Sequence, residues 1–268
     1  MPFTLSHAAA ALPLRRLKLV TSALVIGTLA PDFEYFLRLS PDDGYGHTLQ
    51  GTFVLTLPLA IVTLALFHAF VKVPLAGLFP DNVERRLINH INEFRFAGGA
   101  RFALIVVSIL TGIATHLAWD SFTHSGTWLY RRWLFLRQPI EVLFLGSVPA
   151  YKVFQHASTI LGIVVLSIWL LWWYRNTVPS TRTLSQSMRP LRKVLILVTV
   201  TSIALAGAAI RSIITVGIPI TYPAERRFAG LWVVTSVSLL WWQLVFYGIF
   251  RTKTSPRGSS VEAASRVE

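Results

Sequence analysis

The sequence predicts an all-α, polytopic membrane helix bundle, and three observations support this fold class. Hydrophobic residues make up 53% of the 268 residues, and charged residues make up only 14%. A soluble domain carries about 25% charged residues. Several apolar runs are also about as long as a helix needs to be to cross a bilayer. Low charge, high hydrophobicity and these long runs together indicate an integral membrane protein.

Five runs of roughly 20 predominantly apolar residues are long enough to cross the membrane as helices. They lie at residues 52–71, 102–122, 154–174, 194–218 and 229–250. The polar residues 77–99 predict a loop with one helix. We expect a single transmembrane helical domain over residues 1–250. A disordered tail is expected at 251–268, because this end is rich in serine and charge.

The N-terminal residues 1–40 predict a short helix followed by a re-entrant hairpin. A helix is expected first, with Pro13 near its end. The apolar run at 19–30 is then too short to span the bilayer before Pro31 and Asp32 interrupt it. Such a short run is typical of a re-entrant or interfacial segment.

The net charge of +13 lies mainly in the gaps between apolar runs. In a soluble protein this charge would indicate nucleic acid. Here topology signals and anionic lipid headgroups account for it, so we expect membrane lipid and no nucleic acid as a partner. Fourteen Lys and Arg residues lie on one predicted side and ten on the other. This bias places the C-terminus in the cytoplasm and the N-terminus outside.

His116, Asp120 and His124 follow one another at intervals of four residues near the end of the second apolar run. Residues at this spacing share one face of a helix. Imidazole and carboxylate groups four residues apart can bind one cation, as zinc-binding helices do. A buried aspartate at the centre of a membrane helix costs ~2.5–3.5 kcal/mol, so it needs compensation. Alternatively, the three residues lie in the hydrated headgroup layer, where the cost is small.

The predicted topology brings more candidate ligands to the same membrane face. These candidates precede the first run, surround the re-entrant segment or begin the third run, and they are His7, Asp32, Glu34, His47 and His156. Five of the seven histidines therefore gather on one side. The chain has no cysteine, which excludes thiolate sites. Nitrogen and oxygen donors without thiols suit one or two Zn²⁺ or Mn²⁺ ions.

Each of these additional residues also has a simpler interpretation. His7 could be a polar residue on a helix face, and Asp32 could cap the helix that follows it. Glu34 could be exposed, and His47 could be an ordinary loop residue. His156 could be a hydrogen-bonded core residue, or it could support a ligand rather than bind the metal.

Several stretches resemble an uncharacterised bacterial integral membrane family, domain of unknown function 4184. They include "SALVIGTLAPDFEYFLRL", "GHTLQGTF" and "THLAWDSFTHSGTW". The resemblance extends over most of residues 1–175. It implies a location in the bacterial cell membrane, but it implies no activity.

A looser likeness concerns the order of the polar residues. A histidine, G-x-x-x-P-D, a second histidine and H-x-x-x-D-x-x-x-H occur in this order. The order is similar to membrane-bound metal-dependent hydrolases and to the helical zinc-dependent phospholipase C and nuclease group. It implies the metal ligands His7, Asp32, His47, His116, Asp120 and His124. The phospholipase pattern continues with a carboxylate four residues after a further histidine, whereas here Ile160 follows His156. Glu34 could replace that carboxylate.

We therefore expect a membrane-embedded metal-dependent hydrolase of an ester or phosphoester, with a small-molecule or lipid-like substrate. Asp32 or Asp120 would serve as the general base. The charge bias places the metal site on the outer face. Two alternatives stay open. The same residues could form a metal or proton transporter, or they could hold a purely structural metal ion.

Overall fold

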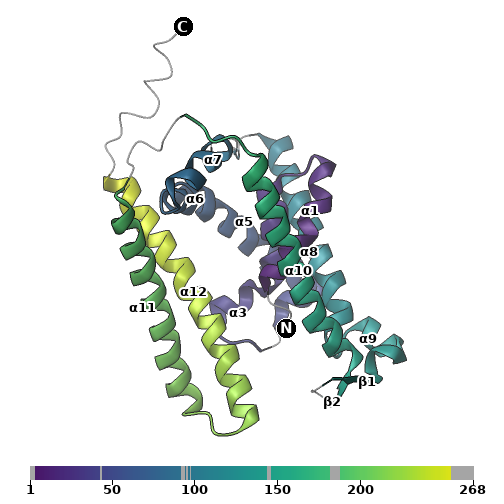
Figure 1. Cartoon of the computed structure of the whole chain (residues 1–268). Helices are drawn as coiled ribbons and strands as arrows, with labels where there is room; N and C mark the ends of the chain where they lie inside the picture. Colours follow the sequence, from purple (N-terminus) through teal and green to yellow (C-terminus); the bar gives the residue numbers. More distant parts are fainter. Residues whose placement is uncertain are drawn as a thin grey trace. The chain divides into compact units, whose positions relative to one another are not determined.

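The computed structural model describes residues 4–42, 44–91, 94, 96, 98–143, 146–181 and 188–254 (Figure 1). It confirms the predicted all-α architecture. Five helical stretches in it are long and apolar enough to cross a membrane, which indicates an integral membrane protein. The last helix continues to Thr254, and the rest of the predicted tail, residues 255–268, lies outside the described residues.

Each predicted apolar run overlaps one of the long helices. The first run lies in a continuous helical stretch, Leu49–Ala76, which contains α4, α5 and α6. These three helices are separated by two π-helical segments, and their bounds are Leu49–Gly51, Leu57–Leu66 and Lys72–Ala76. The other long helices are α8 (Gly99–Thr123), α10 (Ala150–Asn176), α11 (Pro190–Val216) and α12 (Tyr222–Thr254).

The chain forms two compact units. The first comprises residues 1–34, 43–64 and 96–173, and it contains every predicted site residue. The second comprises residues 35–42, 65–95 and 174–268. The single domain over residues 1–250 stays a prediction.

The N-terminal segment is helical, as predicted. A 3₁₀ turn at Thr4–Ala10 leads into α1 (Ala11–Leu14) and a second 3₁₀ turn at Arg15–Leu17. Lys18, with φ +55°, ends this segment. The short α2 (Thr21–Leu29) follows, and then a 3₁₀ turn at Ala30–Asp32 and α3 (Phe33–Arg38).

The core of the first unit is the crossing of α2 and α8, which depends on two glycines. A Cβ on Gly112 would lie 2.4 Å from the carbonyl oxygen of Leu24, and one on Gly27 would lie 2.3 Å from that of Ile109. The backbones therefore approach more closely than any side chain would allow. Ile105, Ile109 and Ile113 are buried along α8. This contact places the end of α2 beside the C-terminal half of α8.

A small polar and aromatic substructure connects α8 to α10. It comprises α9 (Trp128–Arg132), a 3₁₀ turn at Leu134–Arg137, and strands β1 (Pro139–Val142) and β2 (Gly146–Pro149). The strands pair antiparallel, with Pro139 opposite Pro149. Sequence analysis did not predict this hairpin, because four-residue strands that begin or end in proline give little periodic signal.

In the second unit, α11 and α12 pack against each other as an antiparallel pair. Ala204, Ala208 and Ser212 are buried along α11. The polar loop after α6 carries one helix, α7 (Asp81–Ile91), as predicted. Near the start of α7, the ammonium group of the buried Lys193 lies 2.8 Å from the carboxylate of Asp81 and 3.0 Å from that of Glu84.

The close crossing of α2 and α8 yields a direct test of packing. Gly112→Ala should destabilise the protein by about 1–3 kcal/mol, because the new methyl group meets backbone atoms that cannot move aside. Gly99→Ala in the same helix is the matched control, since a Cβ there meets nothing within 4 Å. Thermal unfolding in detergent measures the difference. Equal melting temperatures for the two variants would contradict this account of the crossing.

Candidate metal centre

Helix α8 supplies the centre of the candidate site at its C-terminal end. His116 and Asp120 are buried, with 1% and 6% of their surfaces exposed. Their side chains are four residues apart on the helix and face each other, as predicted. His124 lies one residue beyond Thr123, the last residue of the helix. His124 itself has an extended backbone conformation, which ends the helix, and Gly126, with φ +86°, lies in the turn that follows. The His124 ring nevertheless faces the same cluster.

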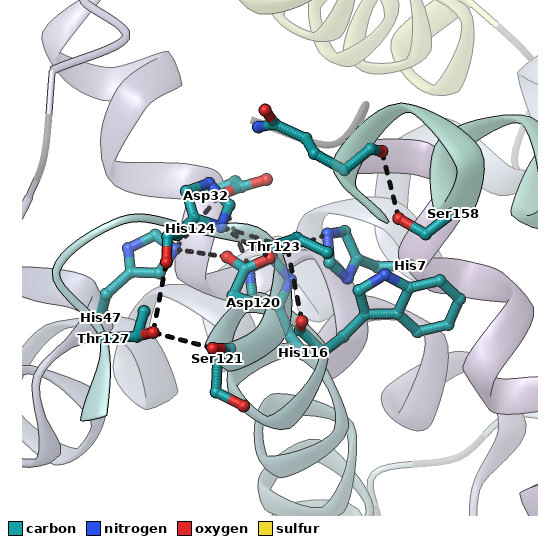
Figure 2. A network of polar contacts seen from close by, with 12 residues as sticks. His7, Asp32, His47, His116, Asp120, Ser121, Thr123, His124, Thr127 and Ser158 are labelled. Carbon is teal, nitrogen blue, oxygen red and sulfur yellow. Dashed lines mark hydrogen bonds and ion pairs between the residues drawn. The ribbon is translucent and has the colours of Figure 1, made fainter. Parts of the chain in front are cut away.

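Three further side chains come from short 3₁₀ turns that are distant in the sequence. His7 lies in the first turn, Asp32 in the turn after α2, and His47 in a turn at Tyr45–His47. Figure 2 shows all three directed toward Asp120, together with His116 and His124. The structure therefore brings together all six residues predicted as metal ligands.

The Asp120 carboxylate lies in the middle of this cluster, and its two oxygens face different histidines. Oδ1 is 3.4 Å from His7 Nε2 and 3.4 Å from His124 Nδ1. Oδ2 is 3.2 Å from His116 Nε2 and 3.6 Å from His47 Nε2. The cluster thus has two sides that share one carboxylate.

Asp32 is oriented by a residue outside the predicted set. The hydroxyl of Thr4 donates a hydrogen bond of 2.6 Å to Asp32 Oδ2. The other oxygen, Oδ1, is 3.4 Å from His47 Nε2 and 3.7 Å from His116 Nε2. The sequence alone gave no signal for Thr4, so its contact with Asp32 was missed.

The orientation of the His116 ring is fixed by the backbone of α2. His116 Nδ1 lies 2.8 Å from the carbonyl oxygen of Thr28, which can only accept a hydrogen bond, so Nδ1 carries the proton. In the neutral ring, the lone pair of Nε2 is then directed into the cluster. The ring also stacks on His7, with centroids 4.0 Å apart. No sequence signal marks Thr28, because the contact uses its backbone.

Four buried atoms of the cluster have no hydrogen-bond partner in the described part of the chain. They are His7 Nδ1, Asp32 Oδ1, His116 Nε2 and Asp120 Oδ1. Each unsatisfied buried polar atom costs about 1–3 kcal/mol, so a group of four calls for an explanation. Two overlapping triads could each hold an ion, with donor atoms within 4.8 Å of one another: His7, His116 and Asp120, and Asp32, His47 and His116. Nitrogen and oxygen donors of this kind fit Zn²⁺ or Mn²⁺.

The cluster is closed on one side and open on the other. The side chains of His7, His116 and Asp32 are at most 2% exposed, whereas those of His47 and His124 are 24% exposed. Water can therefore reach the rings of His47 and His124, which face different oxygens of Asp120.

His7 and His47, which both lie in 3₁₀ turns, have opposite electrostatic environments. Burial, together with the charge of the neighbouring His116 ring, lowers the pKa of His7 to about 4. Burial also opposes the charge of His47, but the carboxylates of Asp120 and Asp32 outweigh it and raise the pKa of His47 to about 9. Without metal, the cluster therefore favours a proton on His47 and none on His7.

Glu34 and His156, the predicted additional ligands or supporting residues, lie outside both triads. The Glu34 carboxylate accepts a hydrogen bond of 2.7 Å from the backbone N–H of Gly46. Thr56 donates to the carbonyl oxygen of Gly46 at 3.0 Å. Glu34 therefore holds the turn that carries His47. His156 is exposed on α10.

The fold and the cluster define a class: an integral membrane protein with a buried histidine and aspartate centre at the end of one long helix. Its family follows from comparison with family models. The model described as Domain of unknown function (DUF4184) matches residues 1–249, so the chain belongs to this family, as the sequence motifs predicted. No curated protein and no solved structure matches the chain. The looser likeness to metal-dependent hydrolases stays a prediction.

The raised pKa of His47 predicts a pH dependence of stability in the metal-free protein. Because this pKa is about 9 in the fold and 6.5 ordinarily, protonated His47 stabilises the fold fully below pH 6.5. The contribution is lost as the pH rises through about 9. With chelator present, the melting temperature of wild type should exceed that of His47→Gln most at low pH, and the two should converge above pH 9. His156→Gln is the control. A difference that grows with pH would contradict this electrostatic assignment.

The contact of Glu34 with Gly46 predicts that removing the Glu34 carboxylate weakens the metal site, although Glu34 belongs to neither ligand triad. Glu34→Ala should lower metal affinity by about 10–100-fold, as loss of supporting contacts typically does. Competition with a chromophoric chelator measures the affinity. The control is Glu141→Ala, since Glu141 is an exposed glutamate of β1. If Glu34→Ala binds metal as tightly as Glu141→Ala, Glu34 has no role in positioning His47.

Proposed function

We propose that this protein is a membrane-embedded, metal-dependent hydrolase of an ester or phosphoester. One observation carries the proposal. Three buried atoms that have no hydrogen-bond partner in the described part of the chain, Asp32 Oδ1, His116 Nε2 and Asp120 Oδ1, come together at the end of α8. Bound metal would satisfy these atoms together, whereas an ordinary polar network would pair them with one another.

The two sides of the Asp120 carboxylate suggest how metal would be held. His116 offers only Nε2, because its Nδ1 is bonded to Thr28, so it can serve a single ion. Asp32 and His47 lie near His116 on the Oδ2 side. His7 and His124 face Oδ1. This division supports two Zn²⁺ or Mn²⁺ ions with Asp120 between them.

The open side of the cluster supports a hydrolytic role. Bound metal would lower the pKa of a water ligand and neutralise charge on the substrate oxygen. Asp32 is suited to receive the proton of that water in a site where it does not itself bind metal. Thr4 holds its Oδ2, and Oδ1 faces the cluster with no hydrogen bond in the described part of the chain. Asp120 faces histidines with both oxygens, so it is better suited to bind metal than to act as the base.

Neither alternative explains the geometry as well. A purely structural ion would be expected to have its ligand shell closed on all sides, whereas His47 and His124 leave this cluster open. A transport pathway needs ionisable groups along the membrane-spanning segments. In α8 the only charged residue before His116 is Arg101, near the opposite end of the helix.

Metal analysis and an activity assay together test the proposal. Purified wild type should contain one or two Zn or Mn per chain by elemental mass spectrometry, and His116→Ala and Asp120→Asn should lose them. Hydrolysis of chromogenic carboxylic ester and phosphodiester substrates should fall by at least about 100-fold in both variants, because the metal-bound water is lost. The matched control His156→Ala should keep both metal and activity.

Three outcomes would overturn the proposal in different ways. Wild type without metal, even after reconstitution, would make the cluster a hydrogen-bonded polar network. Metal without turnover, combined with a lower melting temperature after chelation, would make the ion structural. Metal uptake into proteoliposomes that is lost in Asp120→Asn would identify a transporter.

A further inference from the structure

The substructure between α8 and α10 exposes large apolar side chains beside arginines. We define the interfacial segment as residues 128–143. Trp128 is 71% exposed, Leu134 70% and Leu143 80%, and Trp133 and Phe135 are also exposed. Exposed aromatic and aliphatic side chains in such numbers mark a surface that contacts something other than water.

The place of this segment in the topology limits what that contact can be. It follows α8 and precedes α10, both of which are long and apolar enough to cross a membrane. Figure 1 shows α9 and the β-hairpin together beside the start of α10. A segment at the ends of two spanning helices lies at the depth of the lipid headgroups. Tryptophan is enriched at this depth, because its ring is apolar and its N–H is polar.

Internal contacts hold the interfacial segment in a defined conformation. Trp133 packs edge-on against Phe122 of α8, and Phe135 packs against Phe154 of α10. The Arg137 guanidinium donates a hydrogen bond of 2.9 Å to the carbonyl oxygen of Tyr130. Leu136 is 1% exposed and anchors the 3₁₀ turn. The exposed side chains are therefore presented by a packed scaffold on both spanning helices.

The charge of the segment favours anionic lipid. Residues 128–143 contain three arginines and one glutamate, a net charge of +2. Arg137 is bonded to backbone carbonyl oxygens, whereas Arg131 and Arg132 are exposed beside Trp133. Guanidinium groups recognise phosphate oxygens with paired hydrogen bonds, and basic residues at a membrane surface attract anionic headgroups.

We propose that the interfacial segment is a docking surface for anionic phospholipid headgroups. Its apolar side chains enter the acyl boundary, and Arg131 and Arg132 bind lipid phosphates. This surface begins four residues after His124, so it would gather anionic phospholipids beside the candidate metal centre. The inference does not depend on metal or hydrolysis, and its test uses neither.

Because the chain has no cysteine, a single labelled cysteine reports on one position. Leu134→Cys would carry an environment-sensitive fluorophore in vesicles of equal parts phosphatidylcholine and phosphatidylglycerol. Ile168→Cys, on an exposed mid-helix position of α10, is the lipid reference, and Pro179→Cys is the aqueous reference. Brominated lipid should quench the label at position 134, as it does at 168, and iodide should not. Quenching by iodide alone would overturn the proposal. Resistance to both quenchers would also overturn it and would indicate a second copy or another protein on this surface.

A second arm tests the preference for anionic headgroups. In the mixed vesicles, brominated phosphatidylglycerol should quench the label at position 134 more strongly than brominated phosphatidylcholine. Arg131→Gln/Arg132→Gln should weaken this preference by roughly fivefold for each arginine removed. Arg226→Gln/Arg227→Gln, an exposed arginine pair in α12, is the matched control and should leave it unchanged. Equal quenching by the two brominated lipids in wild type would overturn the proposal that this surface binds anionic headgroups. An unchanged preference in Arg131→Gln/Arg132→Gln would overturn it as well.

Discussion

The structure of the first unit depends on how one carboxylate is accommodated at the end of a membrane helix. Asp120 is only 6% exposed at the end of a predominantly apolar helix. An isolated buried carboxylate would be very costly, so the fold surrounds it with four histidine rings within 3.6 Å. These rings come from α8 and its C-terminal end and from two distant turns. This carboxylate thus links the N-terminal segment to the end of α8.

This arrangement requires backbones to approach more closely than usual. Gly27 and Gly112 let α2 lie against α8, and this contact places the Thr28 carbonyl oxygen 2.8 Å from His116 Nδ1. The ring is therefore oriented by packing among apolar residues as well as by polar contacts. On the other side, Glu34 and Thr56 hold Gly46 and so fix the turn before His47. The apolar core and the polar centre determine each other.

The sequence predicted the long helices well, because bilayer thickness imposes a length that is readable as an apolar run. The spacing of His116 and Asp120 predicted their shared face, because helical periodicity is regular. His7, Asp32 and His47 were predicted from their expected side of the membrane and from an order of polar residues similar to that of metal-dependent hydrolases. Their positions in 3₁₀ turns, and the supporting contacts of Glu34 and Thr28, involve backbone groups of distant segments. Such contacts leave no pattern in a single sequence, and neither did the short β-hairpin.

The position of the cluster at a helix end has a chemical consequence. In the middle of the bilayer, a centre of this kind would meet no water and no polar substrate. At the end of α8 its closed side is formed by the buried His7, His116 and Asp32, and its open side by the partly exposed His47 and His124. Low-dielectric surroundings strengthen the interactions among charged groups, while the open side admits water. A membrane helix that ends in such a centre therefore combines two conditions that hydrolysis at a lipid surface requires.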